Sequence, residues 1–246
     1  MSGPQCCANP PDISSGSRQD DHVEVIGGLT SYTAGSPASK LAVILISDIY
    51  GYEAPKLRQI AEKVAAAGFY VVVPDFFYGD PYLPDMEISS WFPNHQPAKG
   101  CEDARKVVAD LKAKGASAVG AAGFCWGAGV APRPKVYPPL VSKMSAYGEI
   151  EAAVILHPGP LSEDDIHATK VPTAILGAEI DEYAPPEQMK KLGEILSAKP
   201  VDNFVKIYPG VVHGWSTRYR DDDEHAVKSA MEAHTDMLNW FTKYLK

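Results

Sequence analysis

One short segment of the chain carries a residue pattern suited to nucleophilic chemistry. Gly123-Phe-Cys-Trp-Gly127 follows the apolar run 117–122, which places Cys125 on a strand-to-helix turn. Glycine on both sides leaves room for the neighbouring strand and helix. A thiolate on such a turn can attack a carbonyl carbon. The alternative is an ordinary buried cysteine, because the pattern also arises by chance and free cysteine packs as a small hydrophobe.

Two later residues can complete a catalytic triad with Cys125, in which the nucleophile, the acid and the histidine follow one another along the chain. His213 lies in Val212-His-Gly-Trp215, beyond the last predicted strand, where it can act as general base and acid. Asp181 follows the predicted strand 171–176 and can fix the imidazole tautomer, although it can also cap the next helix. The rivals are Glu179 and Glu182 for the acid and His157 for the histidine.

An oxyanion formed by the attack needs hydrogen-bond donors. The backbone N–H of Trp126, directly after the nucleophile, is one. The loop 48–51 should supply the second, which we assign to Ile49. A helix that begins at the turn, together with a nearby imidazolium, is expected to lower the pKa of Cys125.

The rest of the chain alternates apolar strands with helical segments. This alternation predicts an α/β protein with a mostly parallel central sheet, helices on both faces and functional loops at the carboxyl ends of the strands. With the nucleophile turn it predicts an α/β-hydrolase fold. The predicted strands are a pair within 22–32, then 41–46, 69–73, 118–122, 152–156, 171–176 and 204–208; the predicted helices are 57–67, 102–114, 186–198 and 224–244.

We expect one domain, 22–246, after a mobile segment, 1–21, because 246 residues with 45% hydrophobic content can bury one sizeable core. The aromatic-rich segment 76–97 is either a pocket wall or a self-packed surface loop. The prolines from Pro132 to Pro139 cannot all lie inside a helix, so they predict an irregular insertion after the nucleophile turn.

Composition restricts the partners. A net charge of -8 gives no basic surface for nucleic acid or anionic lipid, and no segment is apolar enough for a membrane helix. Without a secretory leader pattern, and with four cysteines that form no disulfide framework, we expect a cytoplasmic protein. We expect no cofactor and no metal, a small-molecule substrate, and a monomer or weak dimer.

Five segments together resemble the dienelactone hydrolase family, from about Val25 to the C-terminus. The likeness is greatest to its plant branch, some members of which carry the name endo-1,3;1,4-beta-D-glucanase. The segments are Ser47-Asp-Ile-Tyr-Gly51, Val73-Pro-Asp75, Gly123-Phe-Cys-Trp-Gly127, Leu176-Gly-Ala-Glu-Ile-Asp181 and Val212-His-Gly-Trp215.

The resemblance implies the triad Cys125, Asp181 and His213. It also implies that Asp48, which stands where bacterial members have Glu, contacts the resting thiol. Of the two arginines that hold a substrate carboxylate in bacterial members, only the second has candidates here, Arg218 and Arg220, because 75–98 contains no Lys or Arg. We assign substrate binding to Tyr50, Tyr78, Trp215 and Arg218.

These observations predict a carboxymethylenebutenolidase-like cysteine hydrolase that acts on an ester, thioester or lactone through an acyl-cysteine. Because 75–98 lacks a cation, a neutral or larger ester or lactone suits it better than a small anion. Two alternatives stay open. One is the glucanase activity of the plant naming, which requires two carboxylates flanking an acetal carbon. The other is a binding protein that keeps the fold without catalysis.

Overall fold

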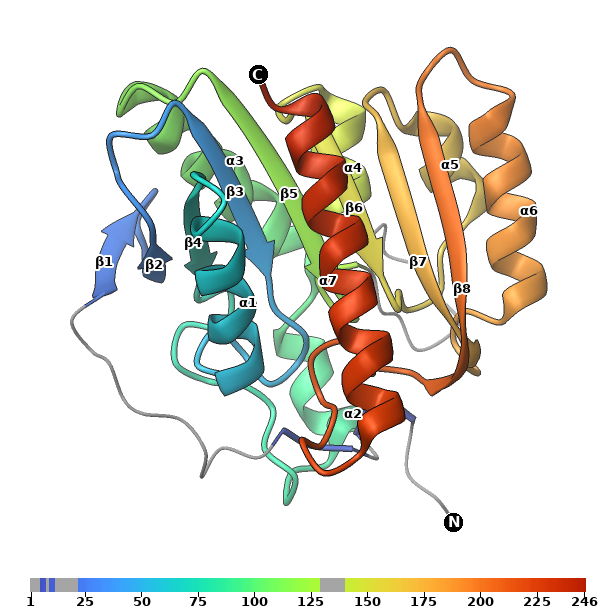
Figure 1. Ribbon diagram of the computed structural model, residues 1–246. Coiled ribbons are helices and arrows are strands. Elements are labelled where there is room, and N and C mark those ends of the chain that lie inside the picture. Colours follow the sequence, from blue (N-terminus) through green and yellow to red (C-terminus); the bar gives the residue numbers. More distant parts are fainter. Residues whose placement is uncertain (1–4, 8, 12–21, 129–139) are drawn as a thin grey trace.

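A computed structural model describes residues 5–7, 9–11, 22–128 and 140–246. Its centre is an eight-stranded sheet with the order β1-β2-β4-β3-β5-β6-β7-β8 (Figure 1). The strands from β3 to β8 run parallel, and β1 and β2 pair antiparallel at one edge. The strands are β1 (Val23–Ile26), β2 (Leu29–Ala34), β3 (Leu41–Ile46), β4 (Tyr70–Pro74), β5 (Ala118–Phe124), β6 (Ala152–Leu156), β7 (Thr173–Ile180) and β8 (Asn203–Val212).

Helices cover both faces of this sheet. On one face pack α1 (Pro55–Ala65) and α7 (Glu224–Tyr244), which lie in front of the strands in Figure 1. On the other face pack α3 (Pro97–Ala113), α4 (Leu140–Tyr147), α5 (Glu163–Ala168) and α6 (Pro186–Ser197). Because both faces are covered, β3 and β4 are continuous apolar runs instead of alternating ones.

The predicted fold class is confirmed, with differences in the extent of some elements. Strand β7 continues to Ile180 and β8 to Val212, so Asp181 and His213 follow their strands directly. Charged and small residues near the ends of these strands interrupt the apolar pattern, so the sequence did not predict these last residues as strand. Their backbones nevertheless pair across the sheet. Helices α4 and α5 have no counterpart in the prediction. The proline-rich stretch Pro132–Pro139 lies outside the described residues, and the first helix described after the nucleophile turn is α4, from Leu140.

Segment 76–97 packs on itself, which was one of its two predicted roles. It contains α2 (Ile88–Trp91) and the short 3-10 helix η4 (Phe92–Asn94), and its aromatic side chains pack on one another. They also pack on Trp126: the ring centroids of Phe77 and Trp126 are 4.8 Å apart, and the Trp126 indole Nε1 donates to the carbonyl of His95 at 2.8 Å. The segment therefore fixes the residue that follows Cys125.

The turn between β5 and the next element is a close crossing of two backbones. A Cβ on Gly123 would lie 2.5 Å from the carbonyl oxygen of Gly127, and a Cβ on Gly127 would lie 2.5 Å from that of Ile46. Cys125 sits at the top with a φ of 48°, a left-handed conformation that non-glycine residues adopt only when the surroundings enforce it. Glycine on both sides is therefore a steric requirement of this turn.

Substitution of either glycine tests this requirement. We expect Gly123→Ala and Gly127→Ala each to lower the free energy of unfolding by about 3 kcal/mol or more, because the added methyl meets backbone that cannot move aside. The control is Gly68→Ala, where φ is 97° but no atom lies within 4 Å of the added Cβ; there we expect a loss of about 1 kcal/mol. Equal losses in urea denaturation of all three variants would contradict the crossing.

Candidate active site

Cys125 is completely buried at the carboxyl end of β5, next to the central strands β3 and β6. Its N–H donates to the carbonyl of Leu156 at 3.2 Å, which fixes the turn to the end of β6. Burial raises the pKa of the Cys125 thiol well above its ordinary value, although the charge of Arg218 acts in the opposite direction. This reverses the predicted lowering, because desolvation outweighs the neighbouring positive charge.

His213 and Asp181 meet at the ends of β8 and β7. The imidazole Nδ1 of His213 lies 2.8 Å from Oδ2 of Asp181, and both side chains are fully buried. Because a carboxylate only accepts hydrogen bonds, Nδ1 carries the proton. The opposite nitrogen, Nε2, has no hydrogen-bond partner among the described residues. An unprotonated Nε2 is the form of imidazole that can accept a proton.

Asp181 also organises its own turn, whereas the alternative role of capping the next helix is wrong, because α6 has Pro185 at its N-cap and no side-chain cap hydrogen bond. Oδ1 of Asp181 accepts from the N–H of Tyr183 at 2.9 Å and of Ala184 at 3.2 Å. One carboxylate oxygen of Asp181 thus binds the turn, and the other binds the imidazole. Neither rival acid is recorded in contact with His213: Glu179 accepts from the N–H of Gly210, and the Glu182 N–H donates to Gln5.

The two predicted oxyanion donors are backbone N–H groups without recorded acceptors. In the described part of the chain, no hydrogen bond is recorded from the N–H of Ile49 or of Trp126. Their neighbours do donate: Tyr50 to Oδ1 of Asp48 at 3.0 Å, and Gly127 to the carbonyl of Ser47 at 3.2 Å. The first bond organises the loop that carries Ile49, and the second joins this loop to the turn that carries Trp126.

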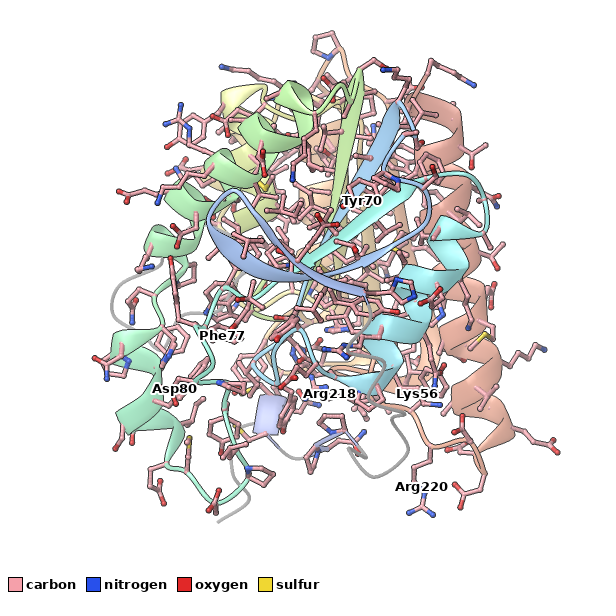
Figure 2. The ribbon with its side chains drawn as sticks, turned by 90° about the vertical axis from the view of Figure 1, so that its left-hand side faces the viewer. Lys56, Tyr70, Phe77, Asp80, Arg218 and Arg220 are labelled. Atoms are coloured by element: carbon pink, nitrogen blue, oxygen red, sulfur yellow. The ribbon has the colours of Figure 1, made fainter. Side chains whose placement is uncertain are left out.

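A buried cation lies beside these groups. Arg218 is 3% exposed, and its Nε is 3.4 Å from Oδ2 of Asp48, which also accepts from the Thr217 hydroxyl at 3.2 Å. The recorded contacts of the Asp48 carboxylate are thus to Tyr50, Thr217 and Arg218, and none is to the thiol of Cys125. Figure 2 shows Arg218 at the end of the molecule where Lys56 and Arg220 also lie, away from Tyr70.

The other predicted substrate-binding residues lie in different surroundings. Tyr50 is buried beside Arg218, whose guanidinium carbon is 5.5 Å from the centre of its ring. Trp215 packs between Tyr208 and His157 in the core on the α7 side of the sheet. Tyr78 is 57% exposed, and its hydroxyl donates to Asp103 on α3. The structure brings Tyr50 and Arg218 together and records no contact of Tyr78 with them.

Two sets of residues near the site have positions that the sequence did not predict: His157, considered only as a rival to His213, and residues 5–7. The imidazole of His157 is fully buried, with Nε2 2.8 Å from the Ser216 hydroxyl and its ring edge-on to that of His213, 5.3 Å between centroids. The signal for it was its position directly after β6. The second set is η1 (Gln5–Cys7), part of the segment expected to be mobile, which packs against the loops of the site.

The parallel sheet, the nucleophile turn and the histidine–aspartate pair at its carboxyl end define an α/β-hydrolase fold. Comparisons with known proteins agree with this class. The model of the dienelactone hydrolase family matches residues 29–245. The chain therefore belongs to the dienelactone hydrolase family, whose members are hydrolases of ester and lactone bonds.

Known proteins with different names are similar to this chain. The chain is 41% identical over 198 residues to a Zea mays protein named endo-1,3;1,4-beta-D-glucanase, covering 78% of this chain but only 61% of that relative. It is 30% identical over 232 residues to the carboxymethylenebutenolidase homolog of Mus musculus, covering 91% of both. A dienelactone hydrolase structure from Anabaena variabilis has a TM-score of 0.64 and 13% identity, covering 91% of this chain and 96% of that one, which supports the fold.

Two features of the described residues concern other classes of function. Within the described ranges, no helix is both long and apolar enough to cross a membrane. Among the same residues, no group of three or more His, Cys, Asp or Glu side chains is arranged to hold a metal ion.

The burial of His213 predicts its protonation behaviour. Desolvation lowers the pKa of His213 below the ordinary 6.5, while Asp181 acts to raise it. The imidazole should therefore stay neutral until the pH falls below 6.5. In Asp181→Asn, which removes the opposing charge, the pKa should fall further. An NMR titration, with the His213 signal assigned from its loss in His213→Gln, measures both values; a wild-type pKa at or above 6.5 would contradict the described environment.

Proposed function

We propose that the chain is a cysteine hydrolase that cleaves a carboxylic ester, thioester or lactone through an acyl-cysteine at Cys125. The observation that carries the proposal is the orientation of His213, which is held by Asp181 through Nδ1 and keeps Nε2 unpartnered. Together with a cysteine on a left-handed turn at the same end of the sheet, this supports the triad Cys125, His213 and Asp181.

The first half of the reaction forms the acyl-enzyme. The resting thiol and imidazole are both neutral, because burial raises the pKa of Cys125 and lowers that of His213. Nε2 of His213 accepts the thiol proton as the sulfur attacks the carbonyl carbon, and Asp181 stabilises the imidazolium that results. The N–H groups of Ile49 and Trp126 donate to the oxyanion. His213 then protonates the leaving oxygen or sulfur as its bond to the acyl carbon breaks.

The second half returns the enzyme to its resting state. Water attacks the thioester carbonyl while Nε2 of His213 accepts one of its protons. The same two N–H groups stabilise the second oxyanion. Its collapse breaks the bond to Cys125, releases the acid and returns the proton to the sulfur. We place the reaction in the cytoplasm, since a reducing compartment keeps the nucleophile as a thiol.

The surroundings favour a neutral acyl group over a small dianion. Arg218 is the buried cation of the site, and its charge already faces the Asp48 carboxylate. Segment 76–97, which packs on Trp126, contributes aromatic rings and no Lys or Arg. We therefore propose neutral esters and lactones with an apolar acyl part as substrates.

Glycoside hydrolysis, which the name of the maize relative describes, fits this site less well. An acetal carbon offers no carbonyl for a thiol, and its hydrolysis needs a protonated acid opposite a second carboxylate. The buried carboxylates at this end of the sheet are Asp48, Asp75 and Asp181. Asp48 and Asp181 already bind Arg218, Thr217 and His213. Asp75 accepts from the N–H groups of Phe77 and Gly79. Among the groups without a hydrogen-bond partner in the described residues, Nε2 of His213 and the N–H groups of Ile49 and Trp126 suit acyl chemistry.

Substitution of the triad separates these functions. With p-nitrophenyl acetate and a panel of simple lactones, Cys125→Ala and His213→Ala should each lose at least about 100-fold in kcat/KM, because each removes a group that forms or breaks a bond. Cys101→Ala, which removes a partly buried thiol on α3, is the matched control and should retain activity. Cleavage of beta-glucan that persists in Cys125→Ala, with no ester turnover in the folded wild type, would overturn the proposal.

A further inference from the structure

The proposed site is closed in this structure. The side chain of Cys125 has no exposed surface, and His213 is 1% exposed. A thiol that no solvent reaches cannot meet a substrate from solution, so some part of the covering must move before the reaction begins. Residues 5–7, which precede the sheet by more than a dozen positions in the sequence, belong to that covering.

The covering segment is η1 (Gln5–Cys7), which we term the strap. Its first residue is fastened to the loop that carries Asp181. The Gln5 amide nitrogen donates to the carbonyl of Ile180 at 3.0 Å, and its amide oxygen accepts from the N–H of Glu182 at 2.8 Å. One side chain thus makes two hydrogen bonds to the residues on either side of Asp181. Both bonds are exposed, so water can replace them when the strap leaves the loop.

The other end of the strap is bound to the remaining loops of the site. Nη1 of Arg218 donates to the carbonyl of Cys6, and the Tyr50 hydroxyl donates to the carbonyl of Cys7 at 3.4 Å. The thiol of Cys6 is 3.6 Å from the Tyr183 hydroxyl. Cys6 is 3% exposed and belongs to the same apolar cluster as Cys125 and Trp126. The strap therefore bridges the loops of Asp181, of Tyr50 and of Arg218.

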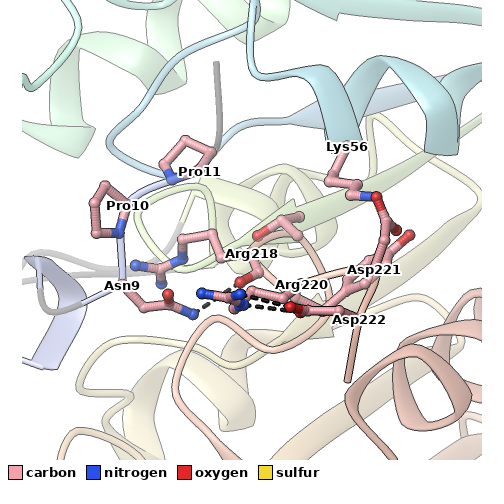
Figure 3. A pocket seen from close by; sticks show the side chains of 10 residues that line it. Asn9, Pro10, Pro11, Lys56, Arg218, Arg220, Asp221 and Asp222 are labelled. Atoms are coloured by element: carbon pink, nitrogen blue, oxygen red, sulfur yellow. Dashed lines mark hydrogen bonds and ion pairs between the residues drawn. The ribbon is translucent and has the colours of Figure 1, made fainter. Parts of the chain in front are cut away.

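The chain just beyond the strap lies along a pocket. Asn9 donates to the carbonyl of Arg218 at 2.8 Å, but a pocket of about 460 Å³ separates residues 9–11 from the loop 217–222. Figure 3 shows Pro10 and Pro11 along one side of this pocket, and Lys56 and Asp221 across from them. Figure 1 shows the same N-terminal pieces below the carboxyl ends of the strands. Open space in this pocket therefore lies beside residues 9–11, directly beyond the strap.

We propose that the strap Gln5–Cys7 is a displaceable cover that closes the active site and determines which acyl groups reach Cys125. This proposal rests on the proposed function for its substrates, but not for the burial of the thiol. Small acyl groups require a small or brief displacement of the strap, whereas bulky ones require it to leave its contacts with Tyr50, Tyr183 and Arg218. The more stable the strap is in its closed position, the more strongly it excludes bulky acyl groups.

Two full-length variants loosen the strap without altering the triad. Gln5→Ala removes both hydrogen bonds to the Asp181 loop and leaves Cys6 and Cys7 unchanged. The variant Gln5→Gly/Cys6→Gly/Cys7→Gly also removes the packing of the two thiols. The matched control is Gln188→Ala on α6, which removes a glutamine bond to the carbonyl of Leu161 away from the strap. Thermal melts of all four proteins show whether each one folds.

The first readout is the rate at which iodoacetamide, a small neutral reagent, alkylates Cys125, followed by peptide mass spectrometry. We expect a rise of about tenfold in Gln5→Ala and a larger rise in the glycine variant, since the loss of one or two hydrogen bonds changes an opening equilibrium by that order. Gln188→Ala should react at the wild-type rate. An unchanged Cys125 rate in both folded strap variants would overturn the proposal.

The second readout is kcat/KM for p-nitrophenyl acetate and p-nitrophenyl octanoate. The strap variants should gain more on the octanoate than on the acetate, and an equal gain on both would contradict a selective role. The two proposals fail separately. Ester turnover with unchanged alkylation refutes the strap and leaves the hydrolase standing. Faster alkylation with no ester turnover in any protein supports the cover and refutes the hydrolase.

Discussion

The close crossing of two backbones beneath Cys125 is the constraint on which the site depends. Gly123, Gly127 and the carbonyl of Ile46 approach so closely that a single methyl on either glycine would overlap backbone atoms. This contact fixes Cys125 in a left-handed conformation at the end of β5. It also determines where the N–H of Trp126 lies, and the aromatic segment 76–97 stabilises that residue from the other side. The remaining groups of the site are placed around this fixed point by the ends of neighbouring parallel strands.

Electrostatics in this interior depend on burial more than on any single charge. Desolvation raises the pKa of the Cys125 thiol and lowers that of His213, so the pair rests as neutral thiol and neutral imidazole. The buried charges are paired beside it: Arg218 faces Asp48, and Asp181 accepts from His213. In the proposed reaction, the thiolate therefore forms only as the proton moves to His213.

Much of the fold could be predicted from the sequence because its determinants are local. The apolar runs that form β3 and β6 have the predicted bounds, and the glycines around Cys125 indicated the turn. The meeting of His213 with Asp181 was predicted from their order along the chain. Properties that depend on tertiary burial could not be read in this way. The raised pKa of Cys125 needs the full covering of the site, and the contact of Cys6 with Arg218 joins residues more than two hundred positions apart.

The central claim, that Cys125 carries the acyl group during turnover, is tested most directly by rapid acid quench of the wild-type protein with p-nitrophenyl acetate, followed by peptide mass spectrometry. Acid preserves a thioester and stops its hydrolysis by the enzyme. The account predicts one acetyl group on the peptide that contains Cys125, formed as fast as the first turnover and lost as substrate is exhausted. Steady ester turnover with no acetyl group on Cys125, or with the acetyl group on another residue, would contradict it.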